Sequence, residues 1–254
     1  MPRKITTKAK AAVKTLTEAA SELAGTVKEQ VSNAQAFIEV FPLARPVLLR
    51  YEGVHDGNPD TPLLEPQPDA VGWYTLGYGH LIIDRETGGR ISHTPAGARR
   101  VKELYPVGIT LEEAETLLQQ DCYVRFIQLR SRPEYCALSY AQQASLLSFS
   151  YNIGVNALYK STAWSMITAG DPKTEIEGDP ADLYVHAVRK GAYSNLAQAF
   201  TAWVRATNAR GLRIVLPGLF ARRLAEFLIF TGTEATDAIE QADLVTRAAI
   251  RPAS

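Results

Sequence analysis

A short aromatic and β-branched segment, residues 73–83, limits the fold of this chain more than any other feature. Its sequence is WYTLGYGHLII, which favours one or two strands that bend at the glycines. Residues 91–93 are a candidate third strand. Apolar residues recur every three or four positions on both sides of this region, as they do in helices. We therefore predict an α+β fold that is dominated by helices.

The composition is that of an ordinary globular protein. The chain has 254 residues, of which 46% are hydrophobic and 21% are charged, so it can bury a sizeable core. Its 27 Lys and Arg residues balance 27 Asp and Glu residues. A chain without an overall basic charge is not typical of nucleic-acid binders, and we expect no nucleic-acid partner. No apolar stretch is long enough for a transmembrane segment.

The two cysteines, Cys122 and Cys136, are too few for a disulfide framework. Two reduced thiols are the favoured interpretation, and a single disulfide is the alternative. No Cys and His residues have the spacing of a zinc site. The spacing therefore predicts no zinc site of this type.

The N-terminal region begins with basic residues and continues with a helical pattern over residues 13–41. Three interpretations are open: a helix packed on its own domain, a coiled-coil contact, or contact of residues 1–41 with a membrane surface. Polar residues interrupt residues 11–24, so a secretory signal peptide is not expected. Pro42 and Pro46 are expected to interrupt the helix before a short helical end at residues 47–53.

Downstream of a Pro- and Gly-rich loop at residues 54–72, the pattern is mostly helical. Thr110 and Glu113 form a capping-box sequence that starts a helix. Further helices are expected at residues 139–151, 157–169, 183–204 and 218–231. A linker at 171–182 and a connector at 210–217 separate them, and a tail with helical character follows residue 232.

Three residues near the predicted strands have the chemistry that a glycosidase needs. Glu52 follows an apolar helical run, a setting that favours a protonated carboxyl group and hence a general acid. Asp69 lies in a polar loop, where a carboxylate stays ionised more easily. Thr75 offers a hydroxyl that can hold a water molecule. A glycosidase uses two such carboxyl groups, one as the general acid and the other as the general base or nucleophile.

The segment from Asp69 to Leu81, DAVGWYTLGYGHL, with Glu52 before it, resembles the active-site segment of phage-type lysozymes, glycoside hydrolase family 24. The gap of five residues between Asp69 and Thr75 is part of this resemblance. Later stretches resemble the family in the same order: ITLEEAE at 109–115, LSFSYNIG at 147–154 and PGLFARRLAE at 217–226.

The resemblance implies a two-lobed lysozyme-like fold, with a small β-sheet lobe and a larger helical lobe. It implies a basic helical extension at 1–44, a catalytic domain at 45–232 and a tail at 233–254. The implied activity is hydrolysis of the β-1,4 bond between N-acetylmuramic acid and N-acetylglucosamine in peptidoglycan, and it requires no cofactor and no metal. Glu52 is then the general acid, Asp69 activates the water, and Thr75 positions it. Inversion and retention of the sugar configuration both remain open.

The resemblance also implies secondary site residues. Leu81, Tyr151, Ser161 and Thr162 match positions that line the sugar cleft. His80 is expected to form an ion pair with Asp121 that ties the two lobes together. Arg222 and Arg223 are either neighbours of Glu52 or surface residues of the last helix.

The chain departs from the family in its N-terminal extension and in two insertions. The insertions lie within residues 55–65 and 171–195. The first makes the gap between Glu52 and Asp69 16 residues long, so Asp56, Asp60 and Glu65 compete for the role of second carboxylate.

The expected role is that of a monomeric phage endolysin in host lysis. It would be made in the host cytoplasm without a signal peptide and would reach the cell wall through a holin or by another route. The alternatives are an antibacterial lysozyme-type effector, a virion-associated lysin and a catalytically silent peptidoglycan-binding module. A further alternative is an interaction protein in which residues 1–44 are the working part.

Overall fold

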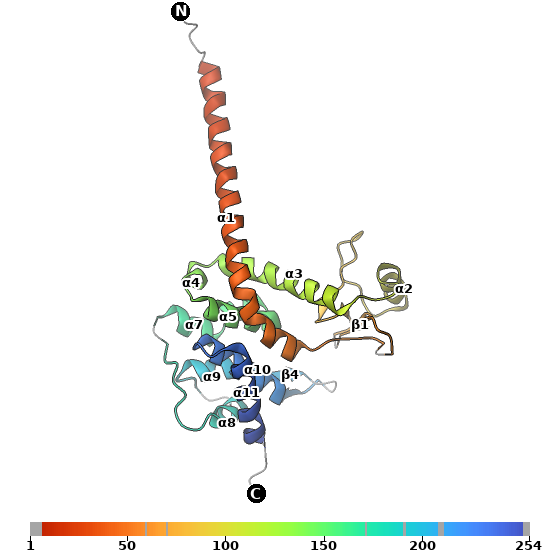
Figure 1. Cartoon of the computed structure of the whole chain (residues 1–254), viewed down its shortest axis with the longest axis vertical. Coiled ribbons are helices and arrows are strands. Elements are labelled where there is room, and N and C mark those ends of the chain that lie inside the picture. The colour runs from red at the N-terminus through yellow and green to blue at the C-terminus, as the bar shows by residue number, and fades with distance from the viewer. Residues whose placement is uncertain are drawn as a thin grey trace, which may run out of the picture. The chain divides into compact units, whose positions relative to one another are not determined.

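The computed structural model describes residues 7–58, 60–69, 71–170, 172–189, 192–207 and 211–250, with side chains described from residue 25 onward. The chain is mostly helical (61%) with small antiparallel sheets, which confirms the predicted fold class (Figure 1). It divides into two compact units, residues 1–39 and 40–254. No helix within the described ranges combines the length and apolar character that a membrane span requires.

The first helix, α1 (Thr7–Glu52), is longer than predicted. The expected interruption at Pro42 and Pro46 is wrong, because both prolines lie inside the helix. Each proline removes one backbone hydrogen bond, but Val47 and Leu48 beside them are fully buried, and their burial offsets this loss. Residues 1–6, which include part of the predicted basic start, lie outside the described residues, as do residues 251–254 of the tail.

A three-stranded antiparallel sheet follows, made of β1 (Gln67–Pro68), β2 (Tyr74–Leu76) and β3 (His80–Leu81). The strands predicted within residues 73–83 are confirmed. The predicted third strand at 91–93 is wrong: these residues contribute an isolated bridge between Ser92 and Trp73, and β1 is the third strand. Residues 91–93 cannot extend further because a helix cap follows directly at Thr94.

The turn between β2 and β3 depends on glycine. Gly77 has a φ of 59°, in the left-handed region that other residues rarely adopt. A Cβ atom at this position would lie 2.6 Å from the Cβ atom of Ala114 in the following helical region. Gly77 therefore allows the sheet to approach that helix closely.

Four helices come next: α2 (Pro95–Leu104), α3 (Leu111–Arg130), α4 (Pro133–Cys136) and α5 (Tyr140–Ile153). The capping box predicted at Thr110 and Glu113 is present at the start of α3. Ser139 and Gln142 form a second capping box at the start of α5. α2 and α4 were not predicted. In Figure 1, α3 runs from the group of helices toward the region of α2 and β1.

The predicted helix at 157–169 is divided into α6 (Val155–Tyr159) and α7 (Thr162–Thr168), because Ser161 caps a new helix. The predicted helix at 183–204 is likewise divided, with Asn195 capping its second part. The connector at 210–217 includes the second strand of a hairpin. The elements of this half are α8 (Asp182–Arg189), α9 (Leu196–Thr201), β4 (Arg205–Thr207), β5 (Arg213–Val215), α10 (Pro217–Phe230) and α11 (Ala235–Ile250).

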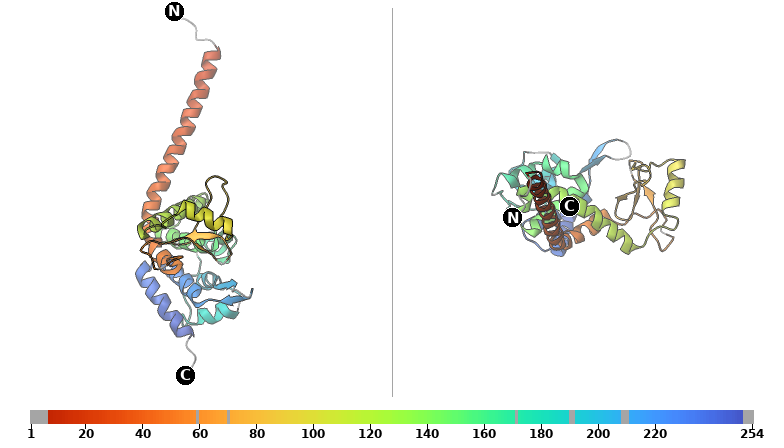
Figure 2. Two further views of the ribbon diagram at one scale, coloured as in Figure 1. Left: turned by 90° about the vertical axis from the view of Figure 1, so that its right-hand side faces the viewer. Right: turned by 90° about the horizontal axis from the view of Figure 1, so that it is seen from above.

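The core of the helical region surrounds α5. All eight residues from 143 to 150 are buried, as expected for a helix covered on every side. Phe149 of α5 packs against Phe200 of α9, with ring centroids 5.1 Å apart, and Phe200 also contacts Phe227 of α10. Figure 2 shows these helices gathered near one end of α3. The three-stranded sheet and α2 lie near the opposite end of α3. The two cysteines are free, with Cys122 buried and Cys136 exposed.

Candidate active site

Glu52 is the last residue of α1, and the left-handed Gly53 ends the helix directly after it. Arg222 of α10 donates from Nη1 to Glu52 Oε1 at 2.5 Å. The Arg222 side chain is 2% exposed and the Glu52 side chain is 16% exposed. The pair thus joins a buried cation to a carboxyl group that still reaches the surface.

A fully buried charge cluster lies behind this pair. Glu226 Oε1 accepts hydrogen bonds from Arg222 Nε at 3.0 Å, Arg223 Nη2 at 3.0 Å and Ser148 Oγ at 2.7 Å. Arg223 also lies over the ring of Phe149, 4.4 Å from its centroid. Burial lowers the pKa of Arg223 to about 9. We call Arg222, Arg223, Glu226 and Ser148 the buried charge cluster.

The cluster gives the two oxygens of Glu52 different surroundings. Oε1 is bound by Arg222, whereas Oε2 has no hydrogen-bond partner within the described parts of the chain.

Asp69 lies in the turn that joins β1 to β2. The backbone N–H groups of Val71 and Trp73 donate to its Oδ1 at 2.8 and 2.9 Å. This turn geometry explains why a short polar residue suits the position. For Oδ2, the described residues provide no hydrogen-bond partner.

The competing acid Asp56 has a comparable local role. Its Oδ1 accepts hydrogen bonds from the backbone N–H groups of Asn58 and Glu65, both at 3.0 Å. It thereby closes the loop that carries the predicted insertion. Asp69 differs from Asp56 because Asp69 belongs to the hairpin that also contains Thr75.

Thr75 occupies the centre of β2, where it pairs with Gln67 of β1 and with Leu81 of β3. Its side chain is nearly buried, and its hydroxyl donates to the Gln67 carbonyl at 3.4 Å. The structure thus brings Thr75 and Leu81 together in one small sheet, with Asp69 in the turn between its first two strands. Glu52 shares no hydrogen bond or ion pair with Asp69 or Thr75 in the described chain.

A polar link joins the sheet to α3 and α5. His80 Nδ1 lies 3.0 Å from Asp121 Oδ2, at the distance expected for the predicted pair. Arg125 donates to the Asp121 carbonyl and lies over the ring of Tyr151, 4.4 Å from its centroid. The Tyr151 hydroxyl donates to the carbonyl of Tyr78 at 3.1 Å. These contacts fix the glycine turn of the sheet against the helices.

Tyr151 is constrained by these contacts. Burial raises its pKa, with the charge of Asp121 adding to the effect. Arg125 covers one face of its ring. Stacking of a sugar on Tyr151 stays a prediction, limited to the other face.

Ser161 and Thr162 lie at the turn between α6 and α7. Ser161 is buried, and its hydroxyl accepts the hydrogen bond that caps α7. Thr162 is exposed. Both residues line a pocket of about 240 Å³ that also includes Lys160, Trp203 and Arg213.

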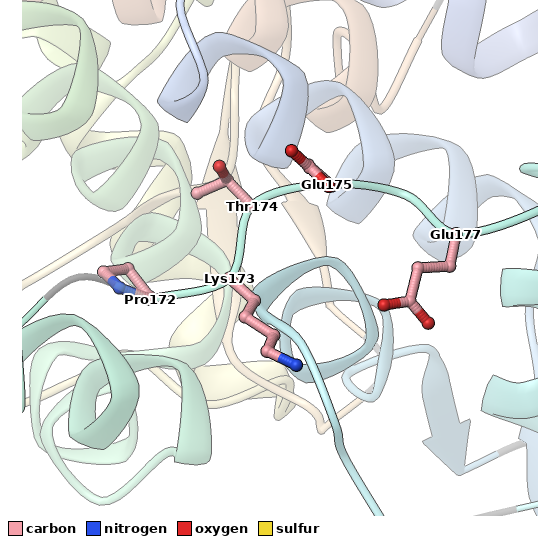
Figure 3. A pocket seen from close by; sticks show the side chains of 5 residues that line it. All are labelled: Pro172, Lys173, Thr174, Glu175 and Glu177. Atoms are coloured by element: carbon pink, nitrogen blue, oxygen red, sulfur yellow. The ribbon is translucent and has the colours of Figure 1, made fainter.

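A second pocket, of about 320 Å³, differs from the first because its lining includes the acidic residues Glu175 and Glu177. It lies along the segment between α7 and α8, within the predicted insertion at 171–195. Figure 3 shows Lys173 and Thr174 on opposite sides of this segment, with Glu175 and Glu177 further along it. Asp171, Lys190 and Gly191 of this insertion lie outside the described residues. Across the described chain, no group of three or more His, Cys, Asp or Glu residues could hold a metal ion.

The sequence interpretation missed two contributors to this region. Glu226 had a detectable signal, because Arg222, Arg223 and Glu226 have the spacing that places charges side by side on a helix. Asp243 of α11, which binds Arg50 and Tyr51 next to Glu52, had none, because its partners are remote in sequence.

Comparison with known proteins gives a family for part of the chain. The phage lysozyme family matches residues 62–179. Two solved structures are similar: the muramidase domain of SpmX from Asticaccaulis excentricus and an endolysin from Escherichia coli O157:H7 phage FAHEc1. The first is 22% identical, covers 74% of this chain and 93% of its own, and has a TM-score of 0.42. The second is 23% identical, covers 75% and 93%, and has a TM-score of 0.44.

No curated protein matches the chain. The family match contains Asp69, Thr75, His80 and Asp121, and it agrees with the resemblance seen in the sequence. Residues 62–179 carry a domain of the phage lysozyme family.

Proposed function

We propose that this protein is a peptidoglycan hydrolase, an N-acetylmuramidase that cleaves the β-1,4 bond between N-acetylmuramic acid and N-acetylglucosamine. The observation that carries the proposal is the family match over residues 62–179, which contains the whole hairpin of Asp69 and Thr75. The ion pair of Glu52 with the buried Arg222 supports it, because it holds an acid in place at the end of α1.

In the proposed reaction, Glu52 donates the proton on Oε2 to the glycosidic oxygen while the bond from that oxygen to the sugar C1 breaks. A water molecule attacks C1, and Asp69 Oδ2 takes its proton. The Thr75 hydroxyl already donates to Gln67, so its oxygen is available to accept a hydrogen bond from that water. This sequence inverts the sugar configuration.

A retaining reaction uses the same residues differently. Asp69 would then attack C1 directly, and water would release the sugar from Asp69 in a second step. The separation of the carboxyl groups decides between the two, because an inverting pair needs roughly 6.5–9.5 Å to admit the water.

The biological role that we propose is lysis of a host cell by a phage endolysin that acts on the cell wall. A virion-associated lysin or an antibacterial effector would use the same chemistry in another setting. The proposed catalytic domain comprises residues 45–232, which holds Glu52, the sheet and the buried charge cluster.

Clearing of a suspension of cells stripped of their outer membrane tests the activity. The wild type should clear it, and Glu52→Gln should lower the rate by about 10²–10⁴-fold, because the amide keeps the hydrogen bond to Arg222 but cannot donate the proton. Glu112→Gln on the exposed face of α3 is the matched control. Equal clearing by Glu52→Gln would reject the assignment of the acid. Binding without clearing by the wild type would instead favour a silent binding module.

A further inference from the structure

The helical extension before residue 40 is a unit of its own, and it carries an apolar repeat that the candidate site does not use. Apolar residues of α1 are spaced by four, three, four, four, three and four positions. We call them the apolar stripe: Leu16, Ala20, Leu23, Val27, Val31, Ala34 and Ile38. This spacing is a repeat of 11 residues, which keeps the stripe on one face of a helix and is typical of helices that pack along one another.

The described parts of the chain leave the end of this stripe uncovered. Val27 and Val31 are each 51% exposed, and Ile38 is 68% exposed. No residue from 25 to 35 is buried, so this stretch of α1 buries no side chain within a single chain. Most helices in proteins depend on burial of their apolar face for stability. The stripe is therefore a surface that a partner would cover.

The charges of α1 are unevenly distributed along its length. Residues 7–17 contain Lys8, Lys10 and Lys14 and no acidic residue, whereas residues 18–39 contain four acidic residues and one basic residue. Two copies of this helix that run in opposite directions bring the basic part of each copy beside the acidic part of the other. Two parallel copies would place like charges together. An anionic membrane surface would attract the first part and repel the second.

The sizes of the apolar residues also favour the antiparallel direction. When the midpoint of the pair lies near residue 25, each apolar residue faces another one in the partner. The layers are Val13 with Ile38, Leu16 with Ala34, Ala20 with Val31 and Leu23 with Val27. Each alanine thus meets a larger residue, as even packing requires. In a parallel pair in register, Ala20 and Ala34 would each face themselves and leave gaps.

We propose that α1 pairs with the α1 of a second copy of this chain, in an antiparallel helical dimer over residues 13–38. The proposal departs from the expected monomer, and it does not depend on the reaction proposed above. Residue 39 of each chain follows the paired stretch, so the two chains leave the pair at opposite ends, about 40 Å apart. The dimer thereby carries two copies of the unit of residues 40–254 without using that unit as its interface.

The oligomeric state of the full chain tests the pair. Sedimentation velocity gives the mass at concentrations between about 1 and 100 µM. Val27→Asp/Val31→Asp places two charges in the stripe. Gly25→Asp/Ser32→Asp adds the same charge on the opposite face of α1, where both positions are exposed and a side chain at residue 25 meets no neighbour, and it is the matched control.

The wild type and the control should form dimers, and the stripe variant should have a dissociation constant at least about tenfold higher. Near-ultraviolet circular dichroism should be the same for all three, because the substitutions lie outside the unit of residues 40–254. A monomeric wild type at about 100 µM, or a stripe variant that dimerises as well as the control, would overturn the proposal. Binding of a monomeric wild type to vesicles of anionic lipid would overturn it in favour of a membrane surface.

Disulfide cross-linking tests the direction of the pair. Every variant carries Cys136→Ser, because Cys136 is exposed and could itself form a cross-link. Ala20→Cys and Val31→Cys are purified separately, mixed and oxidised mildly, and the products are identified by intact mass. In the antiparallel pair, residue 20 faces residue 31 of the partner.

The mixture should therefore give the mixed disulfide. Each variant alone should give almost none, because its two thiols would lie about 16 Å apart along the helix axis, beyond the reach of a disulfide. Disulfides within each variant alone, without the mixed product, would show a parallel pair and overturn the antiparallel assignment.

Discussion

Arg222 and Arg223 are neighbours in sequence, yet they meet different surroundings. Arg222 is shared between the carboxyl groups of Glu52 and Glu226, whereas Arg223 is held by Glu226 and by the ring of Phe149. Two cations thus meet two acids, of which Glu226 is fully buried and Glu52 still reaches the surface. Arg222 therefore divides its hydrogen bonds between Glu52 and Glu226.

Glu226→Gln should lower the free energy of unfolding by about 3–5 kcal/mol, because it leaves the buried Arg223 without a counter-charge. Urea denaturation measures the change. Glu103→Gln removes the acidic partner of an exposed ion pair with Arg100 and should change the midpoint far less. A loss for Glu226→Gln no larger than for Glu103→Gln would contradict the proposed role of the cluster.

Tyr135 should make the stability depend on alkaline pH. Burial raises its pKa well above the ordinary value of 10.0, and its hydroxyl donates to the Gln143 carbonyl. The folded state therefore favours the protonated form, so the stabilisation is complete below pH 10 and is lost as the pH rises above it. Unfolding free energies measured between pH 9 and pH 11 should fall less steeply for Tyr135→Phe than for the wild type. Identical slopes would contradict this assignment.

At the scale of elements, α11 holds the end of α1 that carries Glu52. Asp243 of α11 accepts a hydrogen bond from Arg50 Nη2 at 2.7 Å and one from the Tyr51 hydroxyl at 3.3 Å. Burial and the charge of Asp243 raise the pKa of Tyr51. The C-terminal helix therefore fixes the two residues that precede the proposed acid.

Asp243→Asn should lower kcat about tenfold at a nearly constant KM, because a displaced acid loses its geometry more than its substrate binding. Asp237→Asn on the exposed side of α11 is the matched control and should leave both constants unchanged. Steady-state hydrolysis of soluble glycan fragments gives the two constants. A purely structural role would lower the melting temperature without this split between kcat and KM.

The sequence predicted those helices and strands whose determinants lie close together in the chain. The capping box at Thr110 and the glycine-rich strands of the sheet are examples, because their determinants lie within a few residues. α2 was missed although Thr94 and Pro95 are a recognisable helix start. The continuation of α1 through Pro46 could not be predicted, because it depends on burial against residues that are remote in sequence.

The same distinction holds for the candidate site. The family-like segment predicted the contact of His80 with Asp121, which the structure contains. The catalytic roles of Asp69 and Thr75 stay predictions. The contacts of Glu226 and Asp243 join segments that are far apart in the chain. The hairpin that brings Arg213 to the pocket was likewise expected only as a connector.

At the scale of the whole molecule, every residue with a proposed role in the reaction lies within the compact unit of residues 40–254. The match to the phage lysozyme family begins at residue 62, after Glu52. The proposed acid thus lies at the end of α1, outside the matched residues. In the extension, Val27, Val31 and Ile38 are exposed.

Deletion of residues 1–24 should leave clearing of stripped cells unchanged to within about twofold, because it removes no residue of the proposed site. Clearing of unstripped Gram-negative cells and light scattering on the same protein test the membrane and coiled-coil interpretations of the extension. Loss of clearing on stripped cells, with the circular dichroism of a folded chain, would show that the extension takes part in hydrolysis.

The chemical identity of the new chain ends tests the central claim most directly. Purified peptidoglycan is digested, the products are reduced with borohydride, and their ends are identified by mass spectrometry. The wild type should release products that end in reduced N-acetylmuramic acid, and Glu52→Gln should release almost none. Products that end in reduced N-acetylglucosamine, cleavage within the peptide, or equal release by Glu52→Gln would contradict the account.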